Sequence, residues 1–256
     1  MKLQTLKVNF QQSTNLWRIS KFMKAIILAA GIGSRLRPIT DTIPKCMVSI
    51  NNKMIIDSQI EGLLDNGIED IYVASGYKND VLEDHLGNKY NNVNIVHNSA
   101  FRNTNNMYSL FLARSFLKGK EFILLNADVF VHSSVFRIIC SSGIENAIVC
   151  EKGIYYNESM KICFDEKITS IGKEITREDA YAVSIDIYKF SSGASTKLFE
   201  VSENYIDKNG ENNLWTEVAL NDILGLCDFL PLEIDAPWVE IDDHKDLALA
   251  ETLFSN

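Results

Sequence analysis

Two glycines followed by basic residues form the most informative stretch of the sequence. Gly31 and Gly33 come directly after a short apolar run, and Arg35, Arg37 and Lys45 follow them. Glycines at such a position let backbone N–H groups approach a ligand closely, and nearby cations offset negative charge. This spacing therefore suits the binding of phosphate groups.

Two well-known phosphate-binding patterns do not fit this stretch. The dinucleotide-binding pattern needs Gly or Ala where Leu36 stands, and a P-loop needs Gly-Lys-Ser/Thr where Gly33, Ser34 and Arg35 stand. A Gly-x-Gly alone also occurs in tight turns. The whole stretch nevertheless predicts a phosphate-binding loop of another kind.

Two aspartates follow expected strands farther along the chain. Asp128 ends an apolar run that begins at Phe122, and Asp242 follows the expected strand 239–241. Open α/β sheets bind ligands beyond the carboxyl ends of their strands. We therefore expect Asp128 to face a ligand, while capping of the last helix is the alternative role at positions 242 and 243.

The elements that must position these residues alternate between strands and helices from residue 23 onward. The expected strands are 24–30, 70–75, 93–97, 121–127, 146–150, 160–164, 168–171, 181–190 and 239–241. The expected helices are 54–66, 80–86, 107–117, 134–140, 195–205, 215–224 and 243–254. This alternation predicts an α/β protein with a mostly parallel mixed sheet covered by helices.

Composition and charge exclude several classes of protein. The chain has 256 residues, 46% of them apolar, and a net charge of −9, so disorder throughout and general affinity for nucleic acid are not expected. No run is long and apolar enough to insert in a membrane. Five scattered cysteines favour a reducing compartment, which indicates a cytoplasmic protein. We expect an extension at 1–22, for which a transit peptide is the alternative, and one domain at 23–256.

The string that begins at Leu28 resembles the signature of nucleotidyltransferases, which activate a phosphorylated acceptor with a nucleoside triphosphate. It reads Leu-Ala-Ala-Gly-Ile-Gly-Ser-Arg-Leu-Arg-Pro-Ile-Thr, followed by Ile-Pro-Lys at 43–45. Later segments resemble bacterial CTP:phosphocholine cytidylyltransferases and related phosphonate cytidylyltransferases; they lie at 104–110, 160–173, 187–190, 215–217 and 238–247. The likeness runs from residue 23 to residue 254 and implies a single-domain, Rossmann-like nucleotidyltransferase fold.

The resemblance implies roles in nucleotide binding and catalysis. Arg35 matches the basic residue that faces the β- and γ-phosphates, and Lys45 matches the lysine near the α-phosphate. Preorganised cations at these points stabilise the charge that develops on attack at phosphorus. The nucleotide-binding residues that match are Leu28, Ala29, Ala30, Gly31, Gly33, Ser34, Gly76, Tyr77, Asn106 and Ser109. Core packing for Tyr77 and helix capping for Asn106 are the alternatives.

The resemblance also implies a metal site, in which Asp128 and Asp242 hold Mg²⁺. Two hard oxygen ligands together with phosphates and water suit this ion. A phosphomonoester or phosphonate loses its second proton at about pH 6, so it needs no general base at neutral pH. No catalytic role is therefore expected for the histidines, which are His85, His97, His132 and His244.

Residues in the second half of the chain are expected to bind the acceptor. Lys161 and Lys173 are candidates for contact with its phosphate. Trp215 and Glu217 are candidates for contact with a cationic head such as choline or an amine, which aromatic faces and carboxylates attract. Further aromatic residues for a cage around that head are Tyr181 and Trp238.

The sequence thus predicts a cytidylyltransferase that moves CMP from CTP to a small phosphorylated acceptor, such as phosphocholine or an aminoalkylphosphonate, and releases pyrophosphate. Asp186 stands where a glycine is usual in the resembled family, and an acid there would alter the acceptor pocket. Two alternatives remain: a sugar-1-phosphate nucleotidyltransferase that uses another NTP, and a regulatory protein that keeps the fold without turnover. The oligomeric state is open, with a homodimer as one candidate.

Overall fold

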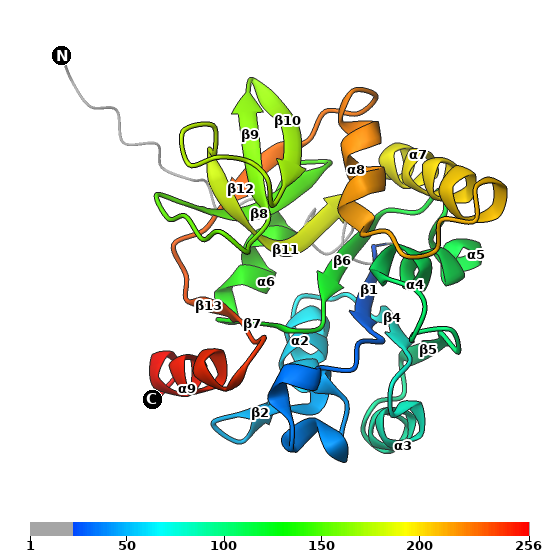
Figure 1. Cartoon of the computed structure of the whole chain (residues 1–256), viewed down its shortest axis with the longest axis vertical. Helices are drawn as coiled ribbons and strands as arrows, with labels where there is room; N and C mark the ends of the chain where they lie inside the picture. The colour runs from blue at the N-terminus through cyan, green and yellow to red at the C-terminus, as the bar shows by residue number, and fades with distance from the viewer. Residues whose placement is uncertain (1–22, 256) are drawn as a thin grey trace.

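A mixed β-sheet forms the centre of the computed structural model, which describes residues 23–255 (Figure 1). The strands of this sheet are β1 (Lys24–Ala29), β4 (Asp70–Ser75), β5 (Val93–His97), β6 (Phe122–Asn126), β8 (Ala147–Lys152), β9 (Lys161–Asp165), β10 (Lys167–Gly172), β11 (Ala182–Phe190) and β12 (Leu230–Glu233). Their order is β10-β9-β11-β6-β1-β4-β5, while β8 pairs with both β11 and β12. β1, β4, β5 and β6 run parallel, and β11 joins β6 antiparallel.

Helices cover both faces of the sheet. They are α2 (Ile55–Leu64), α3 (Asn79–Lys89), α4 (Asn106–Leu112), α5 (Arg114–Leu117), α6 (Ser134–Ser141), α7 (Ser192–Glu203), α8 (Thr216–Leu224) and α9 (His244–Leu253), with short 3-10 turns at Ser34–Leu36, Ile39–Asp41 and Lys45–Met47 and a π-helical turn at Asn204–Lys208. α4, α5, α7 and α8 gather on one side of the sheet in Figure 1. The buried residues of α2, α3 and α6 pack in a second hydrophobic cluster on the opposite face.

Alternation along the central strands explains why there are two clusters. In β1, Ile26 and Leu28 belong to the cluster with α4, α7 and α8, whereas Ala25 and Ile27 belong to the cluster with α2, α3 and α6. Side chains of a strand point to opposite faces in turn, so a strand covered on both faces is apolar throughout. The short apolar runs of the sequence are therefore the buried strands.

Two small antiparallel pairs complete the fold. β2 (Ser49–Ile50) pairs with β3 (Lys53–Met54), and β7 (Val129–Val131) pairs with β13 (Trp238–Glu240). The second pair brings the C-terminal part of the chain beside the end of β6, because β7 follows β6 after two residues. This pairing decides where Asp242 lies.

The predicted α/β architecture, with a mixed sheet between helices, is confirmed. The helix expected over 107–117 is interrupted, since α4 ends at Leu112 and the N–H of Ala113 turns back to the carbonyl of Leu110 at 2.9 Å. The sequence did not predict β2, β3, β7 and β12, which are short or partly exposed. Residues 1–22, expected to be an extension, lie outside the described residues. Within residues 23–255 no helix is long and apolar enough to cross a membrane.

Candidate active site

A cavity of about 430 Å³ opens beyond the carboxyl ends of β1 and β6. Residues from several separate parts of the chain line it, including the glycine-rich loop after β1, the start of α4, the turn after β6 and the start of α8. Six carboxylates and three basic side chains contribute to its wall: Asp128, Glu158, Asp186, Glu217, Glu240 and Asp242, with Arg35, Lys45 and Lys173. The cavity thus carries an excess of negative charge, although it also holds cations suited to phosphate.

The loop after β1 forms one wall of the cavity. A Cβ built on Gly31 would meet nothing within 4 Å, so its backbone faces open space. Gly33 has φ 65, and a Cβ there would lie 2.8 Å from the Cβ of Lys45. The hydroxyl of Thr40 donates to the Gly33 carbonyl at 2.9 Å and holds the turn. Glycine is needed at the two positions for different reasons: Gly31 leaves room for a ligand, and Gly33 permits a left-handed turn.

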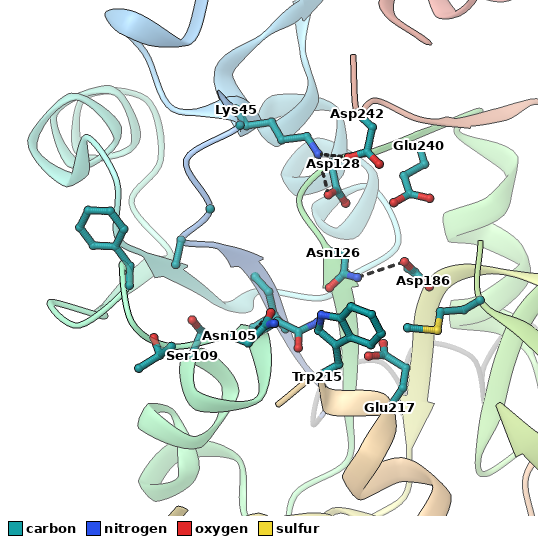
Figure 2. Close-up of a pocket in the computed structure, with 18 of the residues that line it drawn as sticks. Lys45, Asn105, Ser109, Asn126, Asp128, Asp186, Trp215, Glu217, Glu240 and Asp242 are labelled. Atoms are coloured by element: carbon teal, nitrogen blue, oxygen red, sulfur yellow. Dashed lines mark hydrogen bonds and ion pairs between the residues drawn. The ribbon is translucent and has the colours of Figure 1, made fainter. Parts of the chain in front are cut away.

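Lys45 lies between two carboxylates from distant parts of the chain. Its Nζ donates to Asp128 Oδ2 at 2.9 Å and to Asp242 Oδ1 at 2.8 Å. Arg35 pairs with the other oxygen of Asp242 at 2.9 Å. Figure 2 shows Lys45, Asp128 and Asp242 together at one end of the pocket. The residues predicted to act on the phosphates and the metal are thus assembled at one point.

Burial and neighbouring charges both shift the pKa values of Lys45 and Asp242. Burial works to lower the pKa of Lys45, but the carboxylates of Asp128 and Asp242 outweigh it and raise that pKa. Burial works to raise the pKa of Asp242, whereas Lys45 and Arg35 lower it below its usual value. Lysine and aspartate are therefore both charged at neutral pH.

The backbone around Asp128 is fixed by neighbouring elements. Gln59 of α2 is buried and donates to the carbonyls of Asn126 and Val129 at 2.9 Å each. The N–H of Ile241 donates to the Asp128 carbonyl at 2.8 Å. These bonds hold the turn between β6 and β7, so they aim the Asp128 carboxylate into the cavity.

Glu240 joins the two aspartates. One carboxylate oxygen from each of Asp128, Glu240 and Asp242 can be chosen so that the three atoms lie within 4.8 Å of one another. Asp128 Oδ1 is buried and has no hydrogen-bond partner among the described residues. Burial and the carboxylates of Asp186, Asp128 and Asp242 raise the pKa of Glu240 to about 9. A set of hard oxygen atoms with one buried acceptor left free is suited to a divalent cation.

The other end of the cavity holds the residues expected to bind an acceptor. Trp215 precedes α8, Glu217 lies in its first turn, and the ammonium of Lys173 lies 5.1 Å from the centroid of the Trp215 ring. Tyr188 of β11 donates its hydroxyl to Glu217 Oε1 at 2.9 Å and contacts Asp186 Oδ1 at the same distance. Figure 2 shows Trp215, Glu217 and Asp186 away from Lys45 across the pocket.

Comparison with known proteins identifies the family. Residues 24–149 match the family described as Nucleotidyl transferase. Over 249 residues the chain is 34% identical to the CTP:phosphoglutamine cytidylyltransferase of Campylobacter jejuni, covering 88% of this chain and 98% of that protein. The chain belongs to the nucleotidyltransferase family.

A sequence and a solved structure from Streptococcus pneumoniae are also similar to this nucleotidyltransferase. Its choline-phosphate cytidylyltransferase is 43% identical over 115 residues, which span 45% of this chain and 48% of that protein. The solved structure of a CTP:phosphocholine cytidylyltransferase from the same organism matches with a TM-score of 0.76 at 27% identity, over 91% of this chain and 99% of that one. The predicted family and its fold are therefore confirmed.

Most of the predicted nucleotide-binding residues of this nucleotidyltransferase line the cavity, namely Leu28, Ala30, Gly31, Gly33, Ser34, Asn106 and Ser109. Ser109 accepts from the Asn98 amide at 3.0 Å, and Asn106 Oδ1 accepts from the Thr216 N–H at 2.8 Å. The cap of α4 is Asn105, so the alternative of capping for Asn106 does not hold. Asn106 instead ties the start of α8 to the start of α4.

Three predicted nucleotide-binding residues lie outside the cavity wall. Ala29 is buried in the cluster on the α2 face. Gly76 packs so closely that a Cβ would lie 2.8 Å from the Ala30 carbonyl oxygen. Tyr77 donates to the Thr40 carbonyl at 2.9 Å, and its ring meets Phe101 edge-on. Gly76 and Tyr77 therefore support the glycine-rich loop from behind.

Of the residues predicted to bind the acceptor, some line the cavity and others lie outside its wall. Lys173, Trp215 and Glu217 line the cavity, but Lys161 does not. The buried ammonium of Lys161 donates to the carbonyl of Asn157 at 2.9 Å and lies over the Tyr155 ring, so it holds a loop. The expected aromatic cage is incomplete, since its other two members bond to acids elsewhere; these pairs are Tyr181 with Glu233 and Trp238 with Glu151.

Sequence reasoning missed Glu240 and Asn126. Glu240 stands two residues before Asp242 in an extended segment, which places both side chains on one face, and that spacing could have revealed it. Asn126 ends β6 and donates to Asp186 Oδ2 at 3.2 Å. No local signal marks Asn126, because its role depends on β11 lying beside β6.

Proposed function

We propose that this nucleotidyltransferase transfers CMP from CTP to a small phosphorylated acceptor and releases pyrophosphate. The observation that carries the proposal is the meeting of the glycine-rich loop, Lys45, Arg35 and three carboxylates in one cavity. The cavity also holds separate polar residues at its far end, as a second substrate requires. The names of the relatives in Campylobacter jejuni and Streptococcus pneumoniae support CTP as the nucleotide.

The carboxylates at the Lys45 end fit a resident Mg²⁺. Asp128, Glu240 and Asp242 offer only hard oxygen atoms, and the free buried Oδ1 of Asp128 gives such an ion a partner. Asp243, rather than Asp242, caps α9, because its side chain accepts from the N–H groups of Lys245 and Asp246. Asp242 is therefore available to the site. Mg²⁺ bound there supplies neutralisation of phosphate charge.

The chain's own residues then perform the reaction by position and charge. An oxygen of the acceptor's phosphate forms a bond to the α-phosphorus of CTP, while the bond from that phosphorus to the bridging oxygen of the β-phosphate breaks and pyrophosphate leaves. The acceptor is a dianion at neutral pH and needs no base. Lys45 stabilises charge on the α-phosphoryl oxygens, and Arg35 stabilises charge on the leaving pyrophosphate.

The test is release of pyrophosphate by the purified chain with each of CTP, UTP, GTP and ATP. Each nucleotide is paired with phosphocholine, phosphoethanolamine, 2-aminoethylphosphonate or glucose-1-phosphate. We expect turnover with CTP and one of the nitrogen-bearing acceptors. Asp128→Asn serves as the inactive variant, and Asp65→Asn, which changes an exposed aspartate outside the cavity, serves as its matched control.

Two outcomes would contradict the proposal. Turnover of glucose-1-phosphate with another nucleotide, and none with CTP, would identify a sugar-phosphate nucleotidyltransferase. Binding of nucleotide without release of pyrophosphate from any pair would identify a regulatory protein on this fold. The intact arrangement of Lys45, Asp128 and Asp242 argues against the second outcome.

A further inference from the structure

Asp186 and Glu217 form an acidic pair at the end of the cavity away from Lys45 (Figure 2). Glu217 is 3% exposed, and its Oε2 has no hydrogen-bond partner among the described residues. A buried carboxylate oxygen without a donor is costly unless a ligand supplies the donor. Because Glu217 lines the cavity, the missing donor is expected to come from a molecule bound there.

Tyr188 does not satisfy both members of the acidic pair. Its hydroxyl lies 2.9 Å from Asp186 Oδ1 and 2.9 Å from Glu217 Oε1, but a hydroxyl carries only one proton. The Asn126 amide donates to Asp186 Oδ2 at 3.2 Å. Burial and the charge of Glu217 raise the pKa of Asp186 to about 7. Two donors, Tyr188 and Asn126, thus serve four carboxylate oxygens, and Glu217 Oε2 is left without one among the described residues, while Lys173 supplies the nearby positive charge.

The backbone directs Asp186 into this position. β11 shifts register against β8 between Ser184 and Tyr188, and Asp186 within the shift has φ 56. An irregularity of this kind turns a side chain out of the regular alternation of a strand. A left-handed conformation at a residue other than glycine costs free energy, and such strain is found most often at functional sites.

The surroundings of the acidic pair suit N–H donors better than methyl groups. A quaternary ammonium has no N–H and is bound by several aromatic faces. Here Trp215 lines the cavity, but the Lys173 ammonium already lies 5.1 Å from its ring centroid. The two aromatic residues that would complete a cage bond to Glu233 and Glu151 instead. The cavity therefore offers carboxylate oxygens where a quaternary ammonium needs ring faces.

We propose that the acidic pair binds a protonated amine of the acceptor that carries N–H groups, so this site selects a phosphorylated primary amine over its quaternary counterpart. The inference rests on the proposed function, since it assigns the acceptor's head. Asn126, which contacts Asp186, stands two residues before Asp128, so these two positions are at most about 7 Å apart along the chain. An ammonium at the acidic pair and a phosphate at the Lys45 end are thus within the span of one small acceptor.

Phosphoethanolamine and phosphocholine provide the matched test, because they differ only in three N-methyl groups. Kinetic constants are measured by pyrophosphate release with saturating CTP, and binding is measured separately by calorimetry with CTP and EDTA. We expect the unaltered chain to favour phosphoethanolamine by at least about tenfold in both measurements. Asp186→Asn and Glu217→Gln should each reduce this preference to within about threefold, chiefly because each variant binds phosphoethanolamine more weakly.

The variants separate charge from structure. Asparagine tolerates the left-handed region and still accepts from the Tyr188 hydroxyl, so Asp186→Asn keeps the local conformation. Glu233→Gln is the matched control, since it alters a carboxylate that accepts from Tyr181 outside the cavity. It should leave the preference unchanged. A tighter fit for phosphocholine, or a preference that survives both cavity variants, would overturn the inference.

The calorimetric arm keeps the two proposals apart. Preferential binding of phosphoethanolamine without pyrophosphate release would retain the acidic pair as an ammonium site and refute the proposed function. Pyrophosphate release with equal use of both acceptors would retain the function and overturn the ammonium site. Failure of phosphoethanolamine to bind, or tighter binding of glucose-1-phosphate, would also overturn it.

Discussion

Replacement of Lys45 by methionine gives the most direct test of the catalytic arrangement. The side chain is 14% exposed, and its ammonium lies 2.9 Å from Asp128 and 2.8 Å from Asp242. Two unit charges about 4 Å apart interact by about 1 kcal/mol in water and about 4 kcal/mol at the effective dielectric constant of a protein site. Because Lys45 is largely buried, we expect Lys45→Met to reduce the stabilisation of the transition state by nearly as much as the larger of these two energies.

A loss of about 3–4 kcal/mol corresponds to a fall of about 10²–10³-fold in kcat/KM. The assay is pyrophosphate release with CTP and the preferred acceptor, with CTP affinity measured in parallel by calorimetry. Charge gathers on the α-phosphoryl group during reaction, so kcat should fall more than CTP affinity. Lys53→Met is the matched control, because that lysine is 47% exposed and pairs with Glu61 outside the cavity.

Two results would refute this reasoning for Lys45. A fall of less than about tenfold would mean that the ammonium is too far from the reacting phosphate to matter. An equal fall in CTP affinity and in kcat/KM would make Lys45 a residue that binds substrate and transition state alike. The thermal midpoint of the variant must be measured too, because the two aspartates lose their shared partner.

Three more predictions concern the metal, pH and packing. Asp242→Asn should lower kcat by at least about a hundredfold and raise the Mg²⁺ concentration needed for half-maximal rate; unchanged Mg²⁺ dependence would contradict its role as a ligand. Burial works to raise the pKa of Asp57, but hydrogen bonds from neighbouring side chains lower it. The ionised Asp57 carboxylate therefore stabilises the fold above about pH 4, and this stabilisation is lost as the pH falls through the pKa of Asp57 in the folded protein. Urea unfolding should thus show that Asp57→Asn lowers the free energy of unfolding by about 1–3 kcal/mol at about pH 5.5, and by less at about pH 3. The same difference in free energy at both pH values would exclude the carboxylate charge as its cause. Gly76→Ala should lower the thermal midpoint by at least about 3 °C and raise KM for CTP, because the new Cβ would lie 2.7 Å from Phe101 and 2.8 Å from Ala30, which line the cavity. An unchanged thermal midpoint and an unchanged KM would show that the loop can move to make room for the Cβ.

Local pattern was sufficient to predict the buried central strands and the residues at their ends, but not the short strands β2, β3, β7 and β12. The strands before Gly31 and Asp128 are short and largely apolar, and polar or glycine residues follow them, so both the strands and the loop were recognisable. The family string added roles for Arg35 and Lys45. The structure brings all of these together because β1 and β6 are adjacent and parallel.

Residues whose position depends on distant segments were not predictable in the same way. Lys161 looked available for phosphate, but the loop at 155–157 folds over it and takes its ammonium. Gly76 is a glycine because Phe101 and Ala30 press against it, which no local pattern reveals. Asp186 was visible as an exception, yet its pairing with Glu217 depends on where α8 begins.

The contact between Lys45 and Asp242 also bears on how the chain folds. These residues are separated by 197 positions, and Asn51 bonds to the carbonyl of Glu251 across 200 positions. Contacts between residues so far apart in sequence close large loops, and they form late and slowly. During synthesis, β1 and its glycine-rich loop emerge long before β13 and α9. A nascent chain therefore has a phosphate-binding loop without its full set of carboxylates, and the catalytic centre is completed only when the C-terminal segment docks.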